Sequence, residues 1–254
     1  MSRLKEKLTF TDAKMAICLC TIPSPVVTQA LAAAGIDGIV VDLEHGAIDI
    51  SQAHAMIAAT AGTDCAPMAR VSSVNPQEVK RILDMGAEGI IFPLIRTVED
   101  AELAVASMAY PPDGIRGFGP FLAHSRWQTD LMGYRNAKQN DLVCCLTIET
   151  RDAVENIHAI CQVPGIDVIV PAPFDLSTDL GLMGQFQHPE FVAAVAKVEA
   201  AAEAAGIPLA NVARSPEEAQ ALWARGYRMI AGFDILWLKG MAAGVQGWTM
   251  LDPA

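Results

Sequence analysis

The sequence predicts a single (β/α)8 barrel with parallel strands, the TIM-barrel fold, because of its length, its composition and the alternation of short apolar runs with helix-like segments. The chain has 254 residues, close to the ~250 usual for one such barrel. It is 52% hydrophobic, which supplies a large core and argues against a disordered chain. We expect one barrel domain over residues 1–254, although this length leaves room for two domains.

Eight short apolar runs recur along the chain with helix-like segments between them. This alternation is the pattern of βα units and a parallel sheet. Several runs, such as Ile39-Val40-Val41, are apolar throughout, as suits strands that are covered on both faces. The predicted strands are residues 15–22, 38–45, 67–71, 89–95, 142–149, 168–173, 209–213 and 229–234.

Helix starts are marked by capping residues and first-turn prolines. Residues 75–78 and 215–218 each contain a polar capping residue, then a proline, then an acid. Thr97 begins a weaker form of the same helix-start signal. Gly35 and Gly86 stand where a helix would end before the next strand. An open doubly wound sheet is the competing fold, but it would carry a Gly-x-Gly-x-x-Gly turn after an early strand, and the sequence has none.

Residues 110–140 form the longest stretch without a regular pattern. A loop of this length inside a compact domain is usually functional or mobile. The alternative is a connection with no chemical role.

Charge and composition exclude several classes of function. The net charge is −11, with only 18 Lys and Arg residues, which disfavours nucleic-acid binding. No apolar run reaches the ~18 residues of a membrane span and the amino end is charged, so we expect a cytoplasmic protein. The cysteines lack zinc or redox spacing and are interpreted as core thiols: Cys18, Cys20, Cys65, Cys144, Cys145 and Cys161.

Polar residues end four of the predicted strands or follow them closely. His45 and Arg70 are about one βα repeat apart, and so are Glu149 and Asp175. The carboxyl ends of barrel strands meet at one rim, where active sites of this fold lie. We therefore expect these four side chains to face one pocket.

Each of these residues has a chemical and an ordinary interpretation. Glu149 and Asp175 offer hard oxygen ligands that suit Mg²⁺ or Mn²⁺, but each could instead cap the helix after it. Arg70 suits a carboxylate or a developing enolate oxygen, but it could be solvated or ion-paired. His45 could act as a general base or be structural. Thr147 is two residues before Glu149 on the same predicted strand, so its side chain should point to the same side.

A set of motifs in order along the chain points to a family. The motifs are Asp42-Leu43-Glu44-His45, Arg70, the loop from Tyr110-Pro111-Pro112 to Arg116-Gly117-Phe118-Gly119, Ile148-Glu149-Thr150 and Asp175-Leu176-Ser177. From about residue 16 to about residue 240, the chain resembles the class II pyruvate-dependent aldolases of the HpcH/HpaI type, within the phosphoenolpyruvate-utilising barrel superfamily.

The resemblance implies a reaction and roles for particular residues. It implies a Mg²⁺, Mn²⁺ or Co²⁺ site on Glu149 and Asp175, Arg70 on the keto oxygen, and His45 in acid–base chemistry. A bound dication acts as a Lewis acid and, with Arg70, stabilises the enolate formed when the bond to the aldehyde breaks. The substrate-binding residues implied are Arg70, Thr147, Ala172, Pro173, Phe174 and Val212.

The resemblance also implies that Asp84 pairs with the catalytic histidine. Asp84 lies at the end of the third predicted barrel helix, toward the opposite mouth of its own barrel, so we expect it to act from another subunit. This fits the family habit of hexamers, trimers of dimers, with exchanged carboxy-terminal helices.

The implied function is reversible cleavage of 4-hydroxy-2-oxo acids into pyruvate or hydroxypyruvate and an aldehyde. Departures from the family pattern at Leu19, Thr147 and Phe174 leave the aldehyde open. Two alternatives remain: a citrate-lyase-like acyl-CoA lyase on the same barrel, and a non-catalytic barrel that binds 2-oxo acids.

Overall fold

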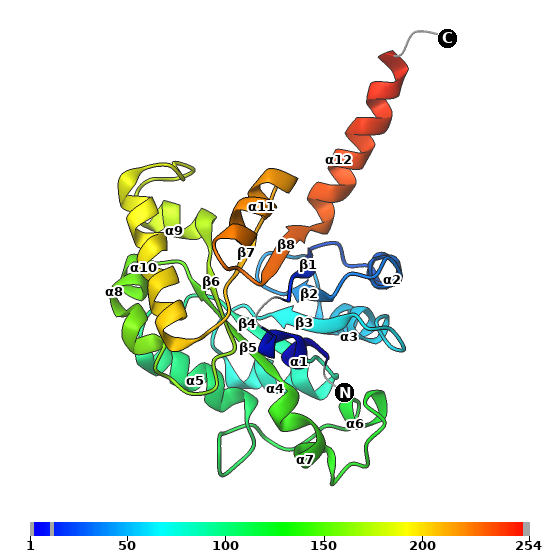
Figure 1. Ribbon diagram of the computed structural model, residues 1–254. Coiled ribbons are helices and arrows are strands. Elements are labelled where there is room, and N and C mark those ends of the chain that lie inside the picture. The colour runs from blue at the N-terminus through cyan, green and yellow to red at the C-terminus, as the bar shows by residue number, and fades with distance from the viewer. Residues whose placement is uncertain (1–2, 11–12, 251–254) are drawn as a thin grey trace.

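The computed structural model describes residues 3–10 and 13–250 and has the predicted barrel architecture (Figure 1). Eight parallel strands are hydrogen-bonded in the order β6-β5-β4-β3-β2-β1-β8-β7. The two end strands meet through a bridge between Ile169 and Leu209, which nearly closes the sheet. The strands are β1 (Met15–Cys20), β2 (Gly38–Asp42), β3 (Ala66–Arg70), β4 (Gly89–Phe92), β5 (Val143–Ile148), β6 (Val168–Pro171), β7 (Ala210–Val212) and β8 (Met229–Phe233).

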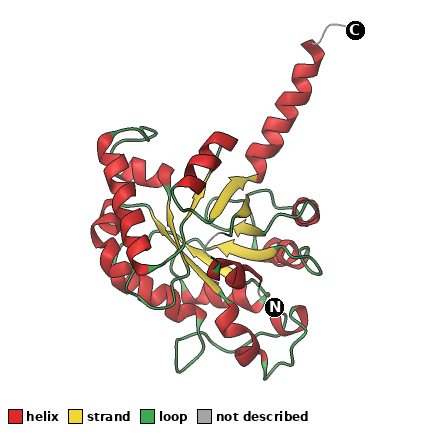
Figure 2. Ribbon diagram, in the orientation of Figure 1, coloured by secondary structure: helices red, strands yellow, loops and turns green. Residues whose placement is uncertain are grey.

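Helices surround the barrel, and the last long helix projects away from it (Figures 1 and 2). No helix in the described part of the chain is long and apolar enough to cross a membrane. The helices are α1 (Arg3–Thr9), α2 (Pro25–Ala33), α3 (Ile50–Ala58), α4 (Pro76–Asp84), α5 (Val98–Met108), α6 (Ala123–Arg126), α7 (Tyr134–Lys138), α8 (Arg151–Ile160), α9 (Pro173–Asp179), α10 (Pro189–Ala205), α11 (Pro216–Ala224) and α12 (Asp234–Gly247), with 3-10 turns η1 (Gln139–Asp141) and η2 (Trp248–Met250).

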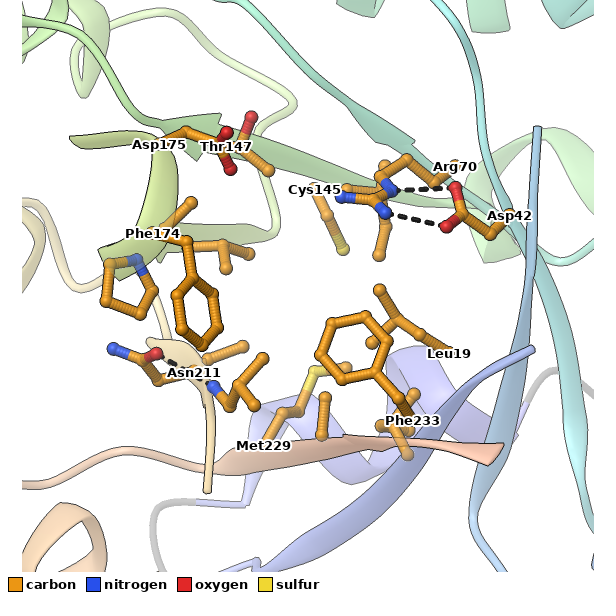
Figure 3. Close-up of a pocket in the computed structure, with 18 of the residues that line it drawn as sticks. Leu19, Asp42, Arg70, Cys145, Thr147, Phe174, Asp175, Asn211, Met229 and Phe233 are labelled. Atoms are coloured by element: carbon orange, nitrogen blue, oxygen red, sulfur yellow. Dashed lines mark hydrogen bonds and ion pairs between the residues drawn. The ribbon is translucent and has the colours of Figure 1, made fainter. Parts of the chain in front are cut away.

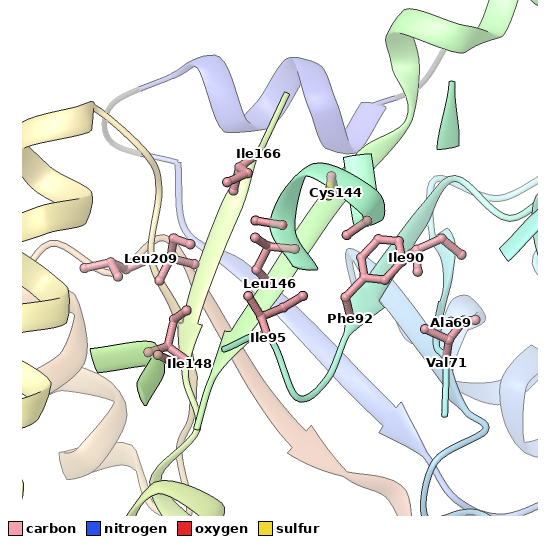
Figure 4. Packing of buried hydrophobic residues seen from close by; sticks show 14 of the residues in the cluster. Ala69, Val71, Ile90, Phe92, Ile95, Cys144, Leu146, Ile148, Ile166 and Leu209 are labelled. Atoms are coloured by element: carbon pink, nitrogen blue, oxygen red, sulfur yellow. The ribbon is translucent and has the colours of Figure 1, made fainter. Parts of the chain in front are cut away.

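The core has two layers because the strands are buried on both faces. The outer layer packs strand residues such as Phe92 and Leu146 against the surrounding helices (Figure 4). The inner layer fills the barrel with Met15, Met68 and their neighbours. Leu4 and Leu8 of α1 join this inner layer, so α1 closes the amino-terminal mouth of the barrel. A ligand must therefore enter at the other mouth.

The predicted strands and helix caps are confirmed. All eight strands occur, although β2 ends at Asp42 and residues 43–45 form the turn after it. Asn75 accepts a hydrogen bond from the backbone of Gln77, and Ser215 accepts one from Glu218. Thr97 forms a full capping box with Asp100, stronger than its sequence indicated. Gly35 and Gly86 end α2 and α4 with φ of 86° and 99°.

The prediction of an irregular stretch over residues 110–140 was partly wrong. This segment contains α6, α7 and η1. Neither α6 nor α7 has a side-chain cap, so the sequence carried no start signal. Burial of Ala123 and Tyr134 holds the segment instead. The six cysteines are buried and free, as predicted.

Candidate active site

A cavity of about 300 Å³ lies at the carboxyl ends of the strands, opposite α1. Figure 3 shows the polar groups of Arg70, Asp42 and Asp175 along one side and Leu19, Phe233 and Met229 on the other. Its lining comes from strands around the whole barrel and from the loops after them: Ile17, Leu19, Thr21, Asp42, His45, Arg70, Ile91, Cys145, Thr147, Val170, Ala172, Pro173, Phe174, Asp175, Ala210, Asn211, Val212, Met229, Ala231 and Phe233.

Arg70 is held by a two-point contact with Asp42 at the ends of neighbouring strands. Its Nε donates to Asp42 Oδ1 at 3.0 Å and its Nη2 donates to Oδ2 at 2.7 Å. Burial alone would lower the pKa of Arg70, but the hydrogen bonds and charge of Asp42, with Glu44, outweigh it and keep this pKa above its ordinary value. Arg70 is thus a fixed, charged fork at the cavity wall.

The turn after β2 places Glu44 and His45 beside this pair. Asp42 Oδ1 accepts hydrogen bonds from the backbone N–H groups of Glu44 at 3.1 Å and His45 at 3.2 Å. Glu44 Oε2 lies 3.2 Å from Arg70 Nη1 and 3.7 Å from His45 Nε2. The side chain of His45 is 62% exposed, so it lies at the mouth of the cavity and can exchange protons with solvent.

Glu149 directly follows β5, and Asp175 lies in the first turn of α9, after β6, on the same polar side of the cavity as Arg70 (Figure 3). Glu149 is buried, and its Oε1 accepts a hydrogen bond of 2.5 Å from the backbone of Leu94. Burial raises the pKa of Glu149, and the charge of Asp175 raises it further. Asp175 lines the cavity. The charges of the two acids therefore interact, but of this pair only Asp175 is among the residues that line the cavity.

This acid pair fits a divalent cation. Two carboxylates in a partly dry site repel each other, and a hard dication offsets that repulsion while leaving ligand positions for substrate and water. Arg70 forms its ion pairs with Asp42 and Glu44 instead. No group of three His, Cys, Asp or Glu residues that could hold a metal occurs within residues 3–10 and 13–250.

The structure brings most of the predicted site residues together. His45, Arg70, Thr147, Ala172, Pro173, Phe174, Val212 and Asp175 line the cavity, whereas Glu149 is not among its lining residues and interacts with it through the charges of Asp175 and Arg70. Thr147 donates from its hydroxyl to the carbonyl oxygen of Phe92 at 3.1 Å, which fixes its orientation.

Asp84 lies elsewhere, as its position in the sequence predicted. It is the last residue of α4, is absent from the lining of the cavity, and pairs with Arg116 at 2.7 Å. A helix that returns antiparallel to its strands ends at the amino-terminal mouth of the barrel. Asp84 therefore cannot reach His45 of its own chain.

Sequence reasoning missed several residues of the site. No role was assigned to Asp42, although it anchors both Arg70 and the turn that carries His45. Its place as the last residue of an apolar strand was the available signal. Phe233 and Asn211 also line the cavity. Side chains alternate between the two faces of a strand, so whether these two point into the barrel can be predicted only once the register of β7 and β8 is known.

Cys145 also faces the cavity but is not a nucleophile. Burial raises the pKa of its thiol well above the ordinary value. The reactive thiolate is therefore scarce at neutral pH.

The chain matches the model of the HpcH/HpaI aldolase/citrate lyase family over residues 18–238. It is 39% identical over 191 residues to the 4-hydroxy-2-oxo-heptane-1,7-dioate aldolase of Salmonella dublin, covering 73% of this chain and 72% of that protein.

Solved structures of similar proteins share the whole fold. An HpcH/HpaI aldolase/citrate lyase family protein from Burkholderia cenocepacia J2315 has a TM-score of 0.91 and 29% identity, covering 98% of this chain and 100% of the other. The HpcH/HpaI aldolase from Desulfitobacterium hafniense DCB-2 has a TM-score of 0.89 and 28% identity, covering 98% and 97%.

Citrate synthase SbnG has a TM-score of 0.87 and 26% identity, covering 98% of each chain. The family model and the relatives named as aldolases show that the chain is a carbon–carbon lyase. This chain is a member of the HpcH/HpaI aldolase/citrate lyase family.

Proposed function

We propose that this protein is a divalent-metal-dependent aldolase that reversibly cleaves 4-hydroxy-2-oxo acids into pyruvate, or hydroxypyruvate, and an aldehyde. One observation carries the proposal. Arg70, whose guanidinium is fixed by Asp42, and Asp175 line the same polar side of a cavity at the carboxyl ends of the strands (Figure 3), and the charges of both interact with Glu149. Two carboxylates that can bind a cation, together with the fixed guanidinium of Arg70, suit a substrate that develops negative charge on a keto oxygen.

Glu149 and Asp175 would hold the metal ion. Their hard oxygen ligands suit Mg²⁺, Mn²⁺ or Co²⁺. When bound, such an ion supplies a Lewis acid beside the keto acid.

Arg70 would stabilise the charge that develops on the keto oxygen. Its contact with Asp42 fixes the fork before substrate arrives, so little reorganisation is needed during the reaction. The N–H groups that Asp42 leaves free are available to an oxyanion in the cavity. Thr147, Ala172, Pro173, Phe174 and Val212 would form the remaining contacts with substrate.

His45 would move the proton at the C4 hydroxyl. In cleavage it takes this proton, directly or through water, and in synthesis it returns it. Its exposed position at the cavity mouth leaves room for a partner from outside the chain. Asp84 of a neighbouring subunit would supply that partner.

This arrangement makes oligomerisation part of the site. α12 leaves the barrel with several large apolar side chains exposed, including Leu236, Trp237 and Met241. An exposed apolar face of this kind marks a protein contact. We expect α12 to pack on a neighbouring subunit in a homo-hexamer, a trimer of dimers.

The relative from Salmonella dublin is named for a dioate substrate. Breaking the bond between C3 and C4 of 4-hydroxy-2-oxoheptane-1,7-dioate would yield pyruvate and 4-oxobutanoate. This aldehyde carries its own carboxylate, so it is a useful probe of the cavity.

Activity and metal dependence test the proposal together. Purified protein with Mg²⁺ or Mn²⁺ should release pyruvate from a 4-hydroxy-2-oxo acid, measured with a coupled lactate dehydrogenase assay. Chelation should abolish the activity and added metal should restore it. The double variant Glu149→Gln, Asp175→Asn should be folded by circular dichroism but inactive.

Two results would reject the proposal. Full activity in metal-stripped protein would rule out the assigned role of the acid pair. Binding of pyruvate that raises Tm, without turnover of any aldehyde, would favour a non-catalytic binding barrel.

A further inference from the structure

The cavity is polar along one rim and apolar elsewhere. Figure 3 shows the rings of Phe174 and Phe233 and the side chain of Leu19 facing the space across from Arg70. We call the apolar wall made by Leu19, Val170, Phe174, Val212, Ala231 and Phe233 the tail subsite. A keto acid held at the polar rim directs the rest of a longer substrate along this wall.

The charges at the cavity do not suit a second carboxylate. Arg70 is the one Lys or Arg among the described lining residues, and it is already paired with Asp42 and Glu44. Asp42 and Asp175 line the cavity, and Glu149 interacts with the charge of Asp175. An anionic group on the tail subsite would lose its water without gaining a cation, which is unfavourable.

Phe174 separates the tail subsite from a second cavity. This neighbour has a volume of about 260 Å³, and Pro173, Phe174, Asn211 and Val212 line both spaces. The ring of Phe174 packs edge-on against Phe186 with centroids 5.6 Å apart. The second cavity contains Arg214, whose guanidinium lies 5.3 Å from the centre of the Phe186 ring and pairs with Glu218 at 2.6 Å. The side chains of this pair are 52% and 40% exposed, so solvent weakens it far more than the buried pair of Arg70 with Asp42. Phe174 thus stands between the reaction site and a cation.

Building on the aldolase reaction above, we propose that the aldehyde partner of this enzyme is uncharged and apolar, and that Phe174 determines this specificity by closing the tail subsite off from Arg214. In synthesis, the methyl carbon of pyruvate loses a proton and bonds to the aldehyde carbon, and the aldehyde oxygen gains a proton as it becomes the C4 hydroxyl. Cleavage reverses each change. The chain of the aldehyde lies on the tail subsite in both directions.

Two aldehydes of matched shape test the proposal. 4-Oxobutanoate and 4-methylpentanal have the same number and branching of non-hydrogen atoms, but only the first is charged. With pyruvate and Mn²⁺, kcat/KM should be at least about tenfold higher for 4-methylpentanal, the discrimination expected when a charge enters an apolar site. Equal use of the two aldehydes, or preference for 4-oxobutanoate, would overturn the proposal.

Variants at Phe174 test the assigned residue. Phe174→Ala should connect the two cavities and shift the ratio of the two kcat/KM values by about tenfold toward 4-oxobutanoate. The double variant Phe174→Ala, Arg214→Gln should lose this shift, while Phe174→Leu should retain the wild-type preference. Both aldehydes react with the same pyruvate carbanion, so damage to that step cancels in the ratio. An unchanged ratio in Phe174→Ala would reject the role of Phe174.

A third measurement separates this inference from the aldolase proposal. Metal-dependent exchange of the pyruvate methyl protons with deuterium, followed by NMR, reports carbanion formation without any aldehyde. Exchange together with preference for 4-oxobutanoate would reject the tail subsite alone. Absence of exchange, with no turnover of either aldehyde, would reject the aldolase reaction and this inference with it.

Discussion

Asp42 connects Arg70 to the backbone of His45. Its Oδ2 accepts from Arg70 Nη2 at 2.7 Å, while its Oδ1 accepts from Arg70 Nε at 3.0 Å and from the backbone N–H of His45 at 3.2 Å. The carboxylate is completely buried. One side chain therefore sets the position of two proposed catalytic groups.

We expect Asp42→Asn to lower kcat by roughly 10²-fold without unfolding the protein. Asparagine has the same shape, but it replaces one acceptor oxygen with an N–H₂ group that cannot accept a hydrogen bond from the Arg70 guanidinium. The guanidinium would then shift, and small misplacements of catalytic groups lower the rate by about 10²-fold. Steady-state kinetics and circular dichroism measure the two effects. Asp113→Asn is the control, because its pair with Arg135 is exposed. An unchanged kcat in Asp42→Asn would contradict the assigned link.

The fold could be predicted from the sequence because its signals are local. Apolar runs marked the strands, and caps such as Asn75 and Ser215 marked the helices. The strand-end rule predicts that Arg70, Glu149 and Asp175 lie at one rim of the barrel.

The rest depends on contacts between residues distant in sequence. The role of Asp42 depends on the alignment of β2 with β3, which brings it opposite Arg70. Phe174 acts as a partition only because α9 and the loop near Phe186 pack together. No local pattern encodes such contacts, so they required the structure.

The Arg116–Asp84 pair should stabilise the protein. Arg116 is buried between the rings of Tyr110 and Tyr134, with its guanidinium carbon 4.5 Å and 5.8 Å from their centres. Arg116→Met would leave Asp84 without its partner. We expect the free energy of unfolding to fall by about 3 kcal/mol, as when one member of a buried pair is removed.

Urea unfolding measures this change. The double variant Arg116→Met, Asp84→Asn should recover part of the loss, because it removes the unpaired charge as well. If the double variant loses the sum of the two single losses, the pair is not coupled.

Subunit mixing tests whether Asp84 acts from a neighbour. His45→Gln and Asp84→Asn should each be nearly inactive alone. When the two are co-expressed and assemble at random, about a quarter of the sites should contain a native His45 and a native Asp84 from different subunits. Activity of the purified mixture is the measurement. A mixture as inactive as its components would exclude a shared site.

Glu44 should destabilise the folded protein at neutral pH despite its contact with Arg70. Burial raises the pKa of Glu44 above its ordinary value of 4.5, and the nearby charge of Arg70 opposes this without cancelling it. Because the folded-state pKa is the higher one, the contribution of Glu44 to stability is complete below pH 4.5 and is lost as pH rises through the folded-state pKa.

We therefore expect Glu44→Gln to raise the free energy of unfolding at pH 7, where the wild-type carboxylate is ionised. The gain should shrink as pH falls and vanish below about pH 4.5, where both proteins are neutral at this position. Urea denaturation at a series of pH values, with chelator present throughout, measures the difference. Glu217→Gln on exposed α11 is the matched control, since burial raises the pKa of Glu44 whereas hydrogen bonding to Ser215 lowers that of Glu217. A loss of stability in Glu44→Gln at pH 7 that disappears as the pH falls would show that the ion pair with Arg70, rather than desolvation, dominates at Glu44.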